Sequence, residues 1–404
     1  MLPNPYTPSD RPRVFVGRDA ERTLLRDKLA RVAAYGEMMG ALTVVTGPRG
    51  VGKTSLLRDV AGQAEADGFV LAWVSCVKQQ PFLGEIVDRV ERSLEQADVT
   101  APGGRRLKEV DVELSAGFAK VRARLDSGPA SPSASTALVG PLEDLLGRAG
   151  RLVRERGGAG LVVMIDELHA PLESTREWEY APDREALLHG AVLLNAIQNL
   201  GGVRDGLPVG VIGAGLPQTK ALLTRAATFG ERSHEIVLAE FGPADAARLL
   251  EAPATNLGVS WAPDALDVVV DTARGYPQSL QILGAATWDA ARPERGSVLD
   301  LAAVEIGSRS ARTALASIFE ARWAVATGSE RAFLHAMAEV GGPVVRRREI
   351  AERLSTTTEA LSMVRRNLIV KGIIEEAGYG RLRFTIPGFE EFVLGQDRTP
   401  GVPE

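Results

Sequence analysis

The amino-acid sequence predicts an α/β protein with a doubly wound parallel sheet, followed by a helical domain and a small C-terminal domain. Three observations carry this prediction. Short apolar runs alternate with helical patterns through residues 1–240, which is typical of parallel strands joined by crossover helices. A glycine-rich loop follows the first of these apolar runs and leads into a helical pattern. From Phe241 onward the apolar residues repeat at helical spacing, and a hairpin pattern lies near the end of the chain.

Composition and charge define the class of protein. The 404 residues are enough for two or three domains, and 45% hydrophobic with 25% charged residues is ordinary for a globular chain. A net charge of −5 excludes a chain-wide electrostatic surface for nucleic acid. The single Cys76 excludes an internal disulfide, and its apolar neighbours predict a buried, unreactive thiol. The sequence shows neither a basic-then-apolar opening nor an apolar run of ~20 residues, so we expect a cytoplasmic protein without membrane contact.

The N-terminal segment leads into the first helix. Residues 4–12 are rich in proline and cannot start a helix, and they are followed by the apolar run 14–16. Asp19 is a good helix N-cap, and Leu25, Leu29 and Val32 then repeat at helical spacing. We expect this helix to pack beside the strand that follows it.

The chain is organised around residues 42–55, LTVVTGPRGVGKTS, in which an apolar run leads into the pattern GxxxxGK[ST]. The loop glycines allow consecutive N–H groups to point at a phosphate chain, and the following helix adds the positive end of its dipole. Lys53 is placed to contact the β and γ phosphates, and the Thr54 hydroxyl to bind Mg²⁺. A plain glycine-rich turn is the alternative. We expect an ATP site in this P-loop formed by Gly47, Pro48, Arg49, Gly50, Val51, Gly52, Lys53, Thr54 and Ser55.

Further helices and strands follow the loop. Residues 54–66 predict a helix, 69–76 a buried parallel strand, and 81–97 an amphipathic helix. Alternating apolar residues over 110–118 predict an inserted strand or hairpin, and the composition of 127–135, SGPASPSAS, predicts a loop.

A second motif is the apolar run 161–165, which ends in Asp166 and Glu167. It begins about 110 residues after the P-loop and follows a helical pattern over 138–156. Strand ends in a doubly wound sheet open onto the ligand crevice, so both carboxylates should face the phosphates. Asp166 is the candidate for holding Mg²⁺ through water, and Glu167 for orienting and polarising the attacking water. A plain strand end is the alternative.

The remaining core predicts two more strands. A polar and aromatic segment, 169–184 with Trp178 and Tyr180, precedes a helix, and its aromatics should cover that helix or contact a partner. Residues 208–215 and 235–238 are then typical of buried strands. The end of the first of these carries no polar side chain, and Gln218 is the first amide after it.

Beyond Phe241, residues 243–251, 263–274 and 277–291 predict a small helical bundle with proline near each helix start. Helical patterns over 330–339, 348–354 and 357–371, followed by a hairpin, then predict a winged helix-turn-helix. Its third helix and hairpin offer a candidate surface for double-stranded DNA. The candidate residues are Arg365, Arg366, Asn367, Arg381 and Arg383. Residues 329–395 hold ten basic and nine acidic side chains, so a protein ligand is the alternative.

In this order, the segments FVGRDAE, GPRGVGKTS, LVVMIDE and GYP and the winged helix resemble origin-recognition-like AAA+ ATPases and the related STAND ATPases. The resemblance implies a P-loop NTPase core (1–240), a helical lid (241–328) and a winged helix (329–404). It further implies that residues 14–18 lie over the adenine and that a lid motif closes on the nucleotide. The residues carried over in this way are Val16, Gly17, Arg18, Gly275 and Pro277.

In oligomeric members of this group an arginine reaches the neighbouring subunit's γ-phosphate, and Arg225 and Arg232 are the candidates, with a solvated arginine as the alternative. The sensor side chain and the usual lid arginine of AAA+ proteins are absent from this sequence. We therefore expect a slowly hydrolysing nucleotide switch that controls DNA binding. The alternatives are a signalling or defence ATPase whose ATP state controls self-association or a protein partner, and a small-molecule kinase.

Overall fold

The computed structural model describes residues 1–8, 10–78, 82–97, 123, 132–173, 184–202 and 207–396. The chain divides into two compact units. The first, here called the sheet unit, comprises Arg18–Gly47 and Lys53–Leu238. The second, here called the helical unit, comprises Met1–Gly17, Pro48–Gly52 and Ala239–Glu404. Within the described residues, every helix is too short or too polar to cross a lipid bilayer.

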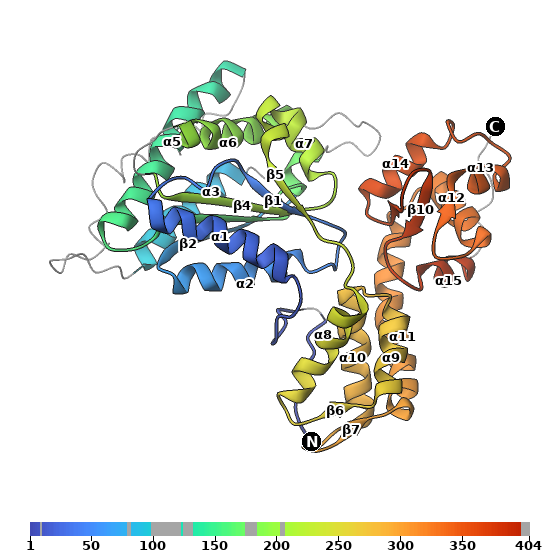
Figure 1. Ribbon diagram of the computed structural model, residues 1–404. Helices are drawn as coiled ribbons and strands as arrows, with labels where there is room; N and C mark the ends of the chain where they lie inside the picture. The colour runs from blue at the N-terminus through green and yellow to red at the C-terminus, as the bar shows by residue number, and fades with distance from the viewer. Residues whose placement is uncertain are drawn as a thin grey trace. The chain divides into compact units, whose positions relative to one another are not determined.

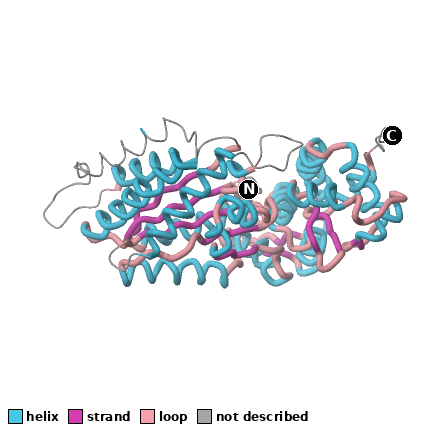
Figure 2. Tube along the Cα trace, turned by 90° about the horizontal axis from the view of Figure 1, so that it is seen from above, coloured by secondary structure: helices cyan, strands magenta, loops and turns pink. Residues whose placement is uncertain are grey.

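The sheet unit is built on a five-stranded parallel sheet with the strand order β2-β3-β4-β1-β5. The strands are drawn as arrows in Figure 1 and in magenta in Figure 2. The strands are β1 (Thr43–Thr46), β2 (Phe69–Ser75), β3 (Gly160–Asp166), β4 (Val209–Gly215) and β5 (His234–Val237). β1 lies between β4 and β5, with Thr43 opposite both Ile212 and His234. In the pairing of β2 with β3, Ser75 lies opposite Asp166, so these two strands end at the same level. The predicted α/β core with a parallel sheet is confirmed.

Helices cover both faces of this sheet (Figure 1). One face carries α1 (Asp19–Tyr35) and α2 (Lys53–Ala66). The other carries α3 (Phe82–Gln96), α5 (Pro132–Glu155), α6 (Arg184–Gly202) and α7 (Thr219–Ala226). Alternate residues of β3, Leu161, Val163 and Ile165, join the core formed with α3, α5 and α6. Burial on both faces is the reason that this strand appears in the sequence as a continuous apolar run.

The loop predicted over residues 127–135 is partly wrong. α5 begins at Pro132, so the last four of these residues are helical. Proline suits the first turn of a helix because the N–H group that it lacks would have no intrahelical partner there. The predicted inserted strand over 110–118 and the aromatics Trp178 and Tyr180 lie outside the described residues.

In the helical unit the first core is formed by helices and by the N-terminal segment. Its elements are α8 (Pro243–Thr255), β6 (Ser260–Trp261), α9 (Pro263–Ala273), α10 (Pro277–Ala291), β7 (Val298–Leu299) and α11 (Leu301–Ala324). Tyr6 packs edge-on against Trp261 and Trp288 and donates to the carbonyl of Leu250 at 2.6 Å. Residues 1–8 are therefore anchored among these helices.

A second core lies near the C-terminus. Its elements are α12 (Gly328–Val340), β8 (Val345–Arg346), α13 (Arg347–Arg353), α14 (Ser362–Val370), β9 (Ile374–Glu376), β10 (Arg381–Phe384) and α15 (Phe389–Leu394). The strands form an antiparallel sheet with the order β8-β10-β9. α11 belongs to both cores, since Val304 packs in the first and Phe319 in the second. α14 starts five residues after the predicted 357, because turns occupy 355–361, where Ser355 has a φ of 52°.

Candidate active site

The P-loop leaves the carboxyl end of β1 and leads directly into α2, which begins at Lys53. The first N–H groups of a helix have no intrahelical partner, so α2 offers them to an anion at the loop. Lys53 is only 5% exposed, and its Nζ donates to the carbonyl of Gly47 at 3.0 Å. The loop thus holds a buried cation at the place where the sequence predicts the phosphates.

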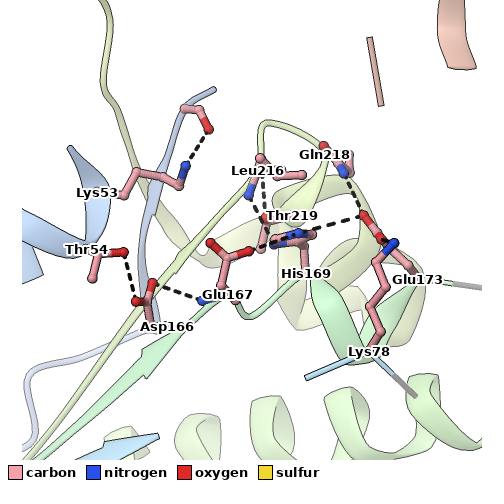
Figure 3. Close-up of polar contacts among 11 residues, drawn as sticks. Lys53, Thr54, Lys78, Asp166, Glu167, His169, Glu173, Leu216, Gln218 and Thr219 are labelled. Atoms are coloured by element: carbon pink, nitrogen blue, oxygen red, sulfur yellow. Dashed lines mark hydrogen bonds and ion pairs between the residues drawn. The ribbon is translucent and has the colours of Figure 1, made fainter. Parts of the chain in front are cut away.

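The two motifs of the sheet unit meet at Thr54 and Asp166. The Thr54 hydroxyl donates to Asp166 Oδ2 at 2.9 Å, as Figure 3 shows. Asp166 is buried at the end of β3, and its Oδ1 accepts from the backbone N–H of Glu167 at 3.0 Å. A hydroxyl and a carboxylate are the oxygen donors that Mg²⁺ prefers. These two predicted ligands, 112 residues apart in the chain, therefore lie together.

Glu167 follows the strand in a left-handed backbone conformation, with a φ of 54°. The side chain is 40% exposed, and Oε2 lies 3.4 Å from Nε2 of His169 (Figure 3). Bonds from Leu168 N to the carbonyl of Ala214 and from Ala170 N to that of Glu167, both 2.8 Å, hold the backbone there. The turn after β3 thus carries the predicted catalytic carboxylate.

Sequence reasoning missed the side chains that surround Glu167. His169 is 1% exposed, and its Nδ1 accepts from the backbone N–H of Leu216 at 3.4 Å. Glu173 Oε1 accepts from Gln218 Nε2 at 2.9 Å, and its Oε2 lies 3.5 Å from Lys78 Nζ. Gln218, the first amide after β4, therefore bonds to Glu173. A histidine two residues after the DE pair was the one available signal for this network.

Cys76 lies beside the same strand end, where its backbone N–H donates to the carbonyl of Asp166 at 2.9 Å. Burial, together with the carboxylates of Asp166, Glu167 and Glu85, raises the pKa of its thiol to about 12. The predicted burial of this cysteine is confirmed, and its low reactivity stays a prediction that the raised pKa supports.

The GYP motif of the helical unit lies at the start of α10, with Pro277 as its first residue. Gly275 has a φ of +73°, and a Cβ there would lie 2.1 Å from the carbonyl oxygen of Phe241. The motif therefore has a clear structural role, since glycine allows this close approach and proline suits the helix start.

Tyr276, between these two residues, is 1% exposed and contacts the P-loop segment of the same unit. Its hydroxyl donates to the carbonyl of Arg49. A Cβ at Gly50, which has a φ of +82°, would lie 2.5 Å from that hydroxyl and 2.3 Å from Gln278 Oε1. The second P-loop glycine is therefore needed for packing as well as for backbone curvature.

The segment expected to lie over the adenine is partly buried. Val16 packs against the first core of the helical unit, and Gly17 lies against Phe241. Arg18, in the sheet unit, is 9% exposed and has a φ of 62°. Their role toward a nucleotide stays a prediction.

The two arginine-finger candidates follow β4. Arg225 lies in the last turn of α7, and Arg232 lies at the end of the 3₁₀ helix η2 (Thr228–Arg232). Both are exposed, and the Arg232 guanidinium stacks over the ring of Phe229 at 5.4 Å from its centroid. An action in a neighbouring subunit stays a prediction.

The five candidates for DNA contact have different surroundings. Arg365 is 23% exposed and lies 3.0 Å from Glu376, while Arg383 bonds to Glu375 and lies 2.7 Å from Glu240. Burial and the neighbouring Glu240 raise the pKa of Glu375. Asn367 is half-buried, and its Oδ1 is buried. Two candidates are exposed, Arg366 on α14 and Arg381 on β10.

The comparisons with known proteins agree with this site. Residues 14–190 match a family model described as an AAA ATPase domain. Residues 316–393 match one described as a domain of unknown function, DUF8462. No curated protein matches the chain.

Among solved structures, a Walker-type ATPase of Pyrococcus abyssi is similar over 95% of this chain and 96% of its own, with 14% identity and a TM-score of 0.58. The RuvB Holliday junction branch migration motor of Thermotoga maritima has 17% identity over 92% and 95% of the two chains, with a TM-score of 0.45. The ORC1 protein of Aeropyrum pernix, solved with DNA, has 18% identity over 96% and 95%, with a TM-score of 0.45. The AAA match includes both nucleotide motifs, and the first structure shares the fold. Residues 14–190 are thus similar to AAA ATPase domains, and the chain shares its fold with a Walker-type ATPase.

Proposed function

We propose that this protein is an ATP-binding, slowly hydrolysing switch whose nucleotide state controls DNA binding through a C-terminal winged helix. The observation that carries the nucleotide part is the 2.9 Å bond between the Thr54 hydroxyl and Asp166. It joins the two motifs that the sequence assigns to one magnesium site. The AAA match over residues 14–190 supports the same function.

The residues present suit Mg·ATP. Lys53 is a buried cation at the start of α2, and its Nζ would contact the β and γ phosphates. Thr54, with Asp166 acting through water, would hold Mg²⁺, which neutralises phosphate charge when bound. Glu167, partly exposed beside them, would orient and polarise the attacking water.

We expect slow hydrolysis because this site lacks groups that stabilise the transition state in faster enzymes of this kind. β4 ends in Gly213, Ala214 and Gly215, so its end offers no polar side chain to the γ-phosphate. Gln218 bonds to Glu173 instead, and the start of α10 carries no arginine. Such donors act on developing charge, and their loss slows turnover more than it weakens binding.

The C-terminal elements support a winged helix. α12, α13 and α14 precede the β9–β10 hairpin, and β8 pairs with that hairpin as an edge strand. Arg381 lies opposite Arg346 in this pairing, and Tyr379 at the hairpin tip is fully exposed. We assign contacts with the DNA phosphate backbone to this arginine-rich edge. Arg366 is the residue that we assign to the major groove of the DNA.

A protein ligand for the winged helix is the second candidate. It is favoured by the ion pairs of Arg365 and Arg383 with carboxylates, which occupy two of the side chains expected to contact DNA. Met363 on α14 is 58% exposed, as an apolar contact residue would be. In this alternative ATP controls assembly, as in the STAND proteins that the motifs resemble.

Calorimetry with Mg·ATP tests the nucleotide part. We expect measurable heat and raised thermal stability for the wild type, with loss of both in Lys53→Ala. Lys28→Ala, on α1, is the matched control and should bind as the wild type does. Absence of heat in the wild type, with identical unfolding curves with and without ligand, refutes ATP binding.

Duplex binding with and without ATP tests the DNA part. We expect binding that depends on the nucleotide, with a negative slope of log K against log salt. Arg381→Ala should make that slope shallower by about 0.9, which is the value for one neutralised phosphate. Arg309→Ala on α11 is the control, since Arg309 forms a surface pair with Glu305. No affinity at low salt in either state removes the DNA part. Nucleotide-dependent oligomers that disappear in Lys53→Ala would then favour the assembly switch.

A further inference from the structure

The backbone at Glu167 is held firmly, but its side chain is not held by these bonds. Its N–H donates to Asp166, its carbonyl accepts from Ala170, and Leu168 bonds to Ala214 on β4. A left-handed conformation at a non-glycine residue costs about 1–3 kcal/mol, and such residues cluster at functional sites. The glutamate side chain has three torsions, so the contacts of its carboxylate decide where that carboxylate lies.

His169 is placed to do this. It is 1% exposed, and its Nε2 lies 3.4 Å from Oε2 of Glu167. Its Nδ1 faces the N–H of Leu216 at 3.4 Å and can accept that bond only if it carries no proton. The bonding pattern therefore assigns the neutral tautomer with the proton on Nε2. Nε2–H is then the donor of the ring, and the carboxylates of Glu167 and Glu173 lie near it.

Glu173 is the other carboxylate near this ring, with Oε1 at 4.0 Å from Nε2. That same oxygen accepts from Gln218 at 2.9 Å, and Oε2 lies 3.5 Å from Lys78. Glu173 thus has nearer donors, while Glu167 is the nearer acceptor for His169. Leu216 follows β4 directly, so His169 connects the end of that strand to Glu167 (Figure 3).

We propose that His169 is a positioning residue for Glu167. Nε2–H holds Oε2 of the carboxylate, and Oε1 accepts the proton of the attacking water. This inference rests on the proposed function, because it assigns Glu167 to the hydrolysis of ATP. The 3.4 Å contact between Nε2 and Oε2 does not meet the geometry of a hydrogen bond in this structure, and catalytic contacts commonly tighten only when substrate binds.

NMR of the protein labelled with ¹⁵N at histidine tests the contact without any ATP. The chain has four histidines, so substitution of each assigns the spectrum. We expect His169 to show a protonated Nε2 and an unprotonated Nδ1, and its Nε2 resonance to move in Glu167→Gln. A protonated Nδ1 in the neutral ring, or a spectrum of His169 unchanged by Glu167→Gln, overturns the inference.

Hydrolysis assays test the role. His169→Leu removes the donor, whereas His169→Gln restores an N–H at a similar reach. We expect kcat to fall about 10- to 100-fold in His169→Leu, since a misplacement of about 1 Å costs up to 10²-fold. We expect substantial recovery in His169→Gln and unchanged ATP affinity in both. His189→Leu, at a buried histidine packed on Phe82, is the control and should keep the wild-type kcat.

A double variant separates positioning from a structural role. In the Glu167→Gln background, His169→Leu should change residual hydrolysis less than about twofold, because the group that it orients is gone. Equal losses in both backgrounds, or a kcat that His169→Leu leaves unchanged, overturn the inference. Absence of Mg·ATP binding by the wild type refutes the proposed function instead, and the NMR contact distinguishes the two failures.

Discussion

Cys76 offers a direct measure of the electrostatics at the candidate site. Its thiol is 8% exposed, beside the carboxylates of Asp166 and Glu167. Burial is the main cause that raises its pKa from 9.0 to about 12, and these carboxylates add to it. At pH 8 the thiolate fraction should be about a thousandfold lower than in the unfolded chain. At about 1.4 kcal/mol per pKa unit, this shift corresponds to roughly 4 kcal/mol by which folding favours the thiol over the thiolate.

The raised pKa of this thiol makes the free energy of unfolding depend on pH. The folded protein binds the thiol proton more tightly, so this contribution is fully present below pH 9 and is lost as the pH rises through about 12. Thiolate absorbance measured against pH should therefore give a midpoint far above that of the denatured protein. Maleimide labelling at pH 8 should be at least a hundredfold slower in the native state.

Variants at the neighbouring carboxylates complete this test. Asp166→Asn and Glu167→Gln should each lower the native midpoint, because each removes a negative charge that disfavours the thiolate. Asp267→Asn on α9, in the helical unit, is the control and should leave it unchanged. A native midpoint below pH 10, or insensitivity to both carboxylates, would refute the reasoning.

Three further predictions concern single residues. Tyr6→Phe should lower the free energy of unfolding by about 1–2 kcal/mol in urea melts, since the hydroxyl bonds both Leu250 and Trp261, and an unchanged midpoint would contradict this. Gly275→Ala should cost about 1–3 kcal/mol in the same assay, from the positive φ and the contact with Phe241, whereas a stabilised variant would argue against it. Burial raises the pKa of Tyr276 to about 12, so its contribution to stability should be complete below pH 10 and be lost toward pH 12, and Tyr276→Phe should weaken this alkaline loss.

Much of the sheet unit could be predicted because its signals are local. The P-loop pattern and the run ending in Asp166 and Glu167 each follow a buried strand. Parallel strands end at one edge of a sheet, so the meeting of Thr54 with Asp166 followed from strand direction alone. Three helix starts of the helical unit could also be predicted, since proline marks the starts of α8, α9 and α10.

Other features depend on partners that are distant in the chain. His169 looks like an ordinary residue until the backbone N–H of Leu216 and the carboxylate of Glu167 are seen beside it. The prolines of the N-terminal segment did not reveal that Tyr6 is buried against Trp261. Arg365 has an outward position in the helical pattern, yet Glu376 on the next strand pairs with it. The spacing of apolar residues predicts on which face of a helix a residue lies. It does not predict which side chain of another element will lie opposite.

The sequence by itself determined the order of the elements, the phosphate loop and the identity of the candidate metal ligands, because each rests on residues a few positions apart. The tertiary structure alone decided which groups surround those ligands. The raised thiol pKa of Cys76, the turn at Glu167 and the bond from Leu216 to His169 arise where β2, β3 and β4 end side by side. The physical reason is that pKa values, tautomers and side-chain orientation depend on distances between atoms, and folding sets these distances for residues far apart in the chain.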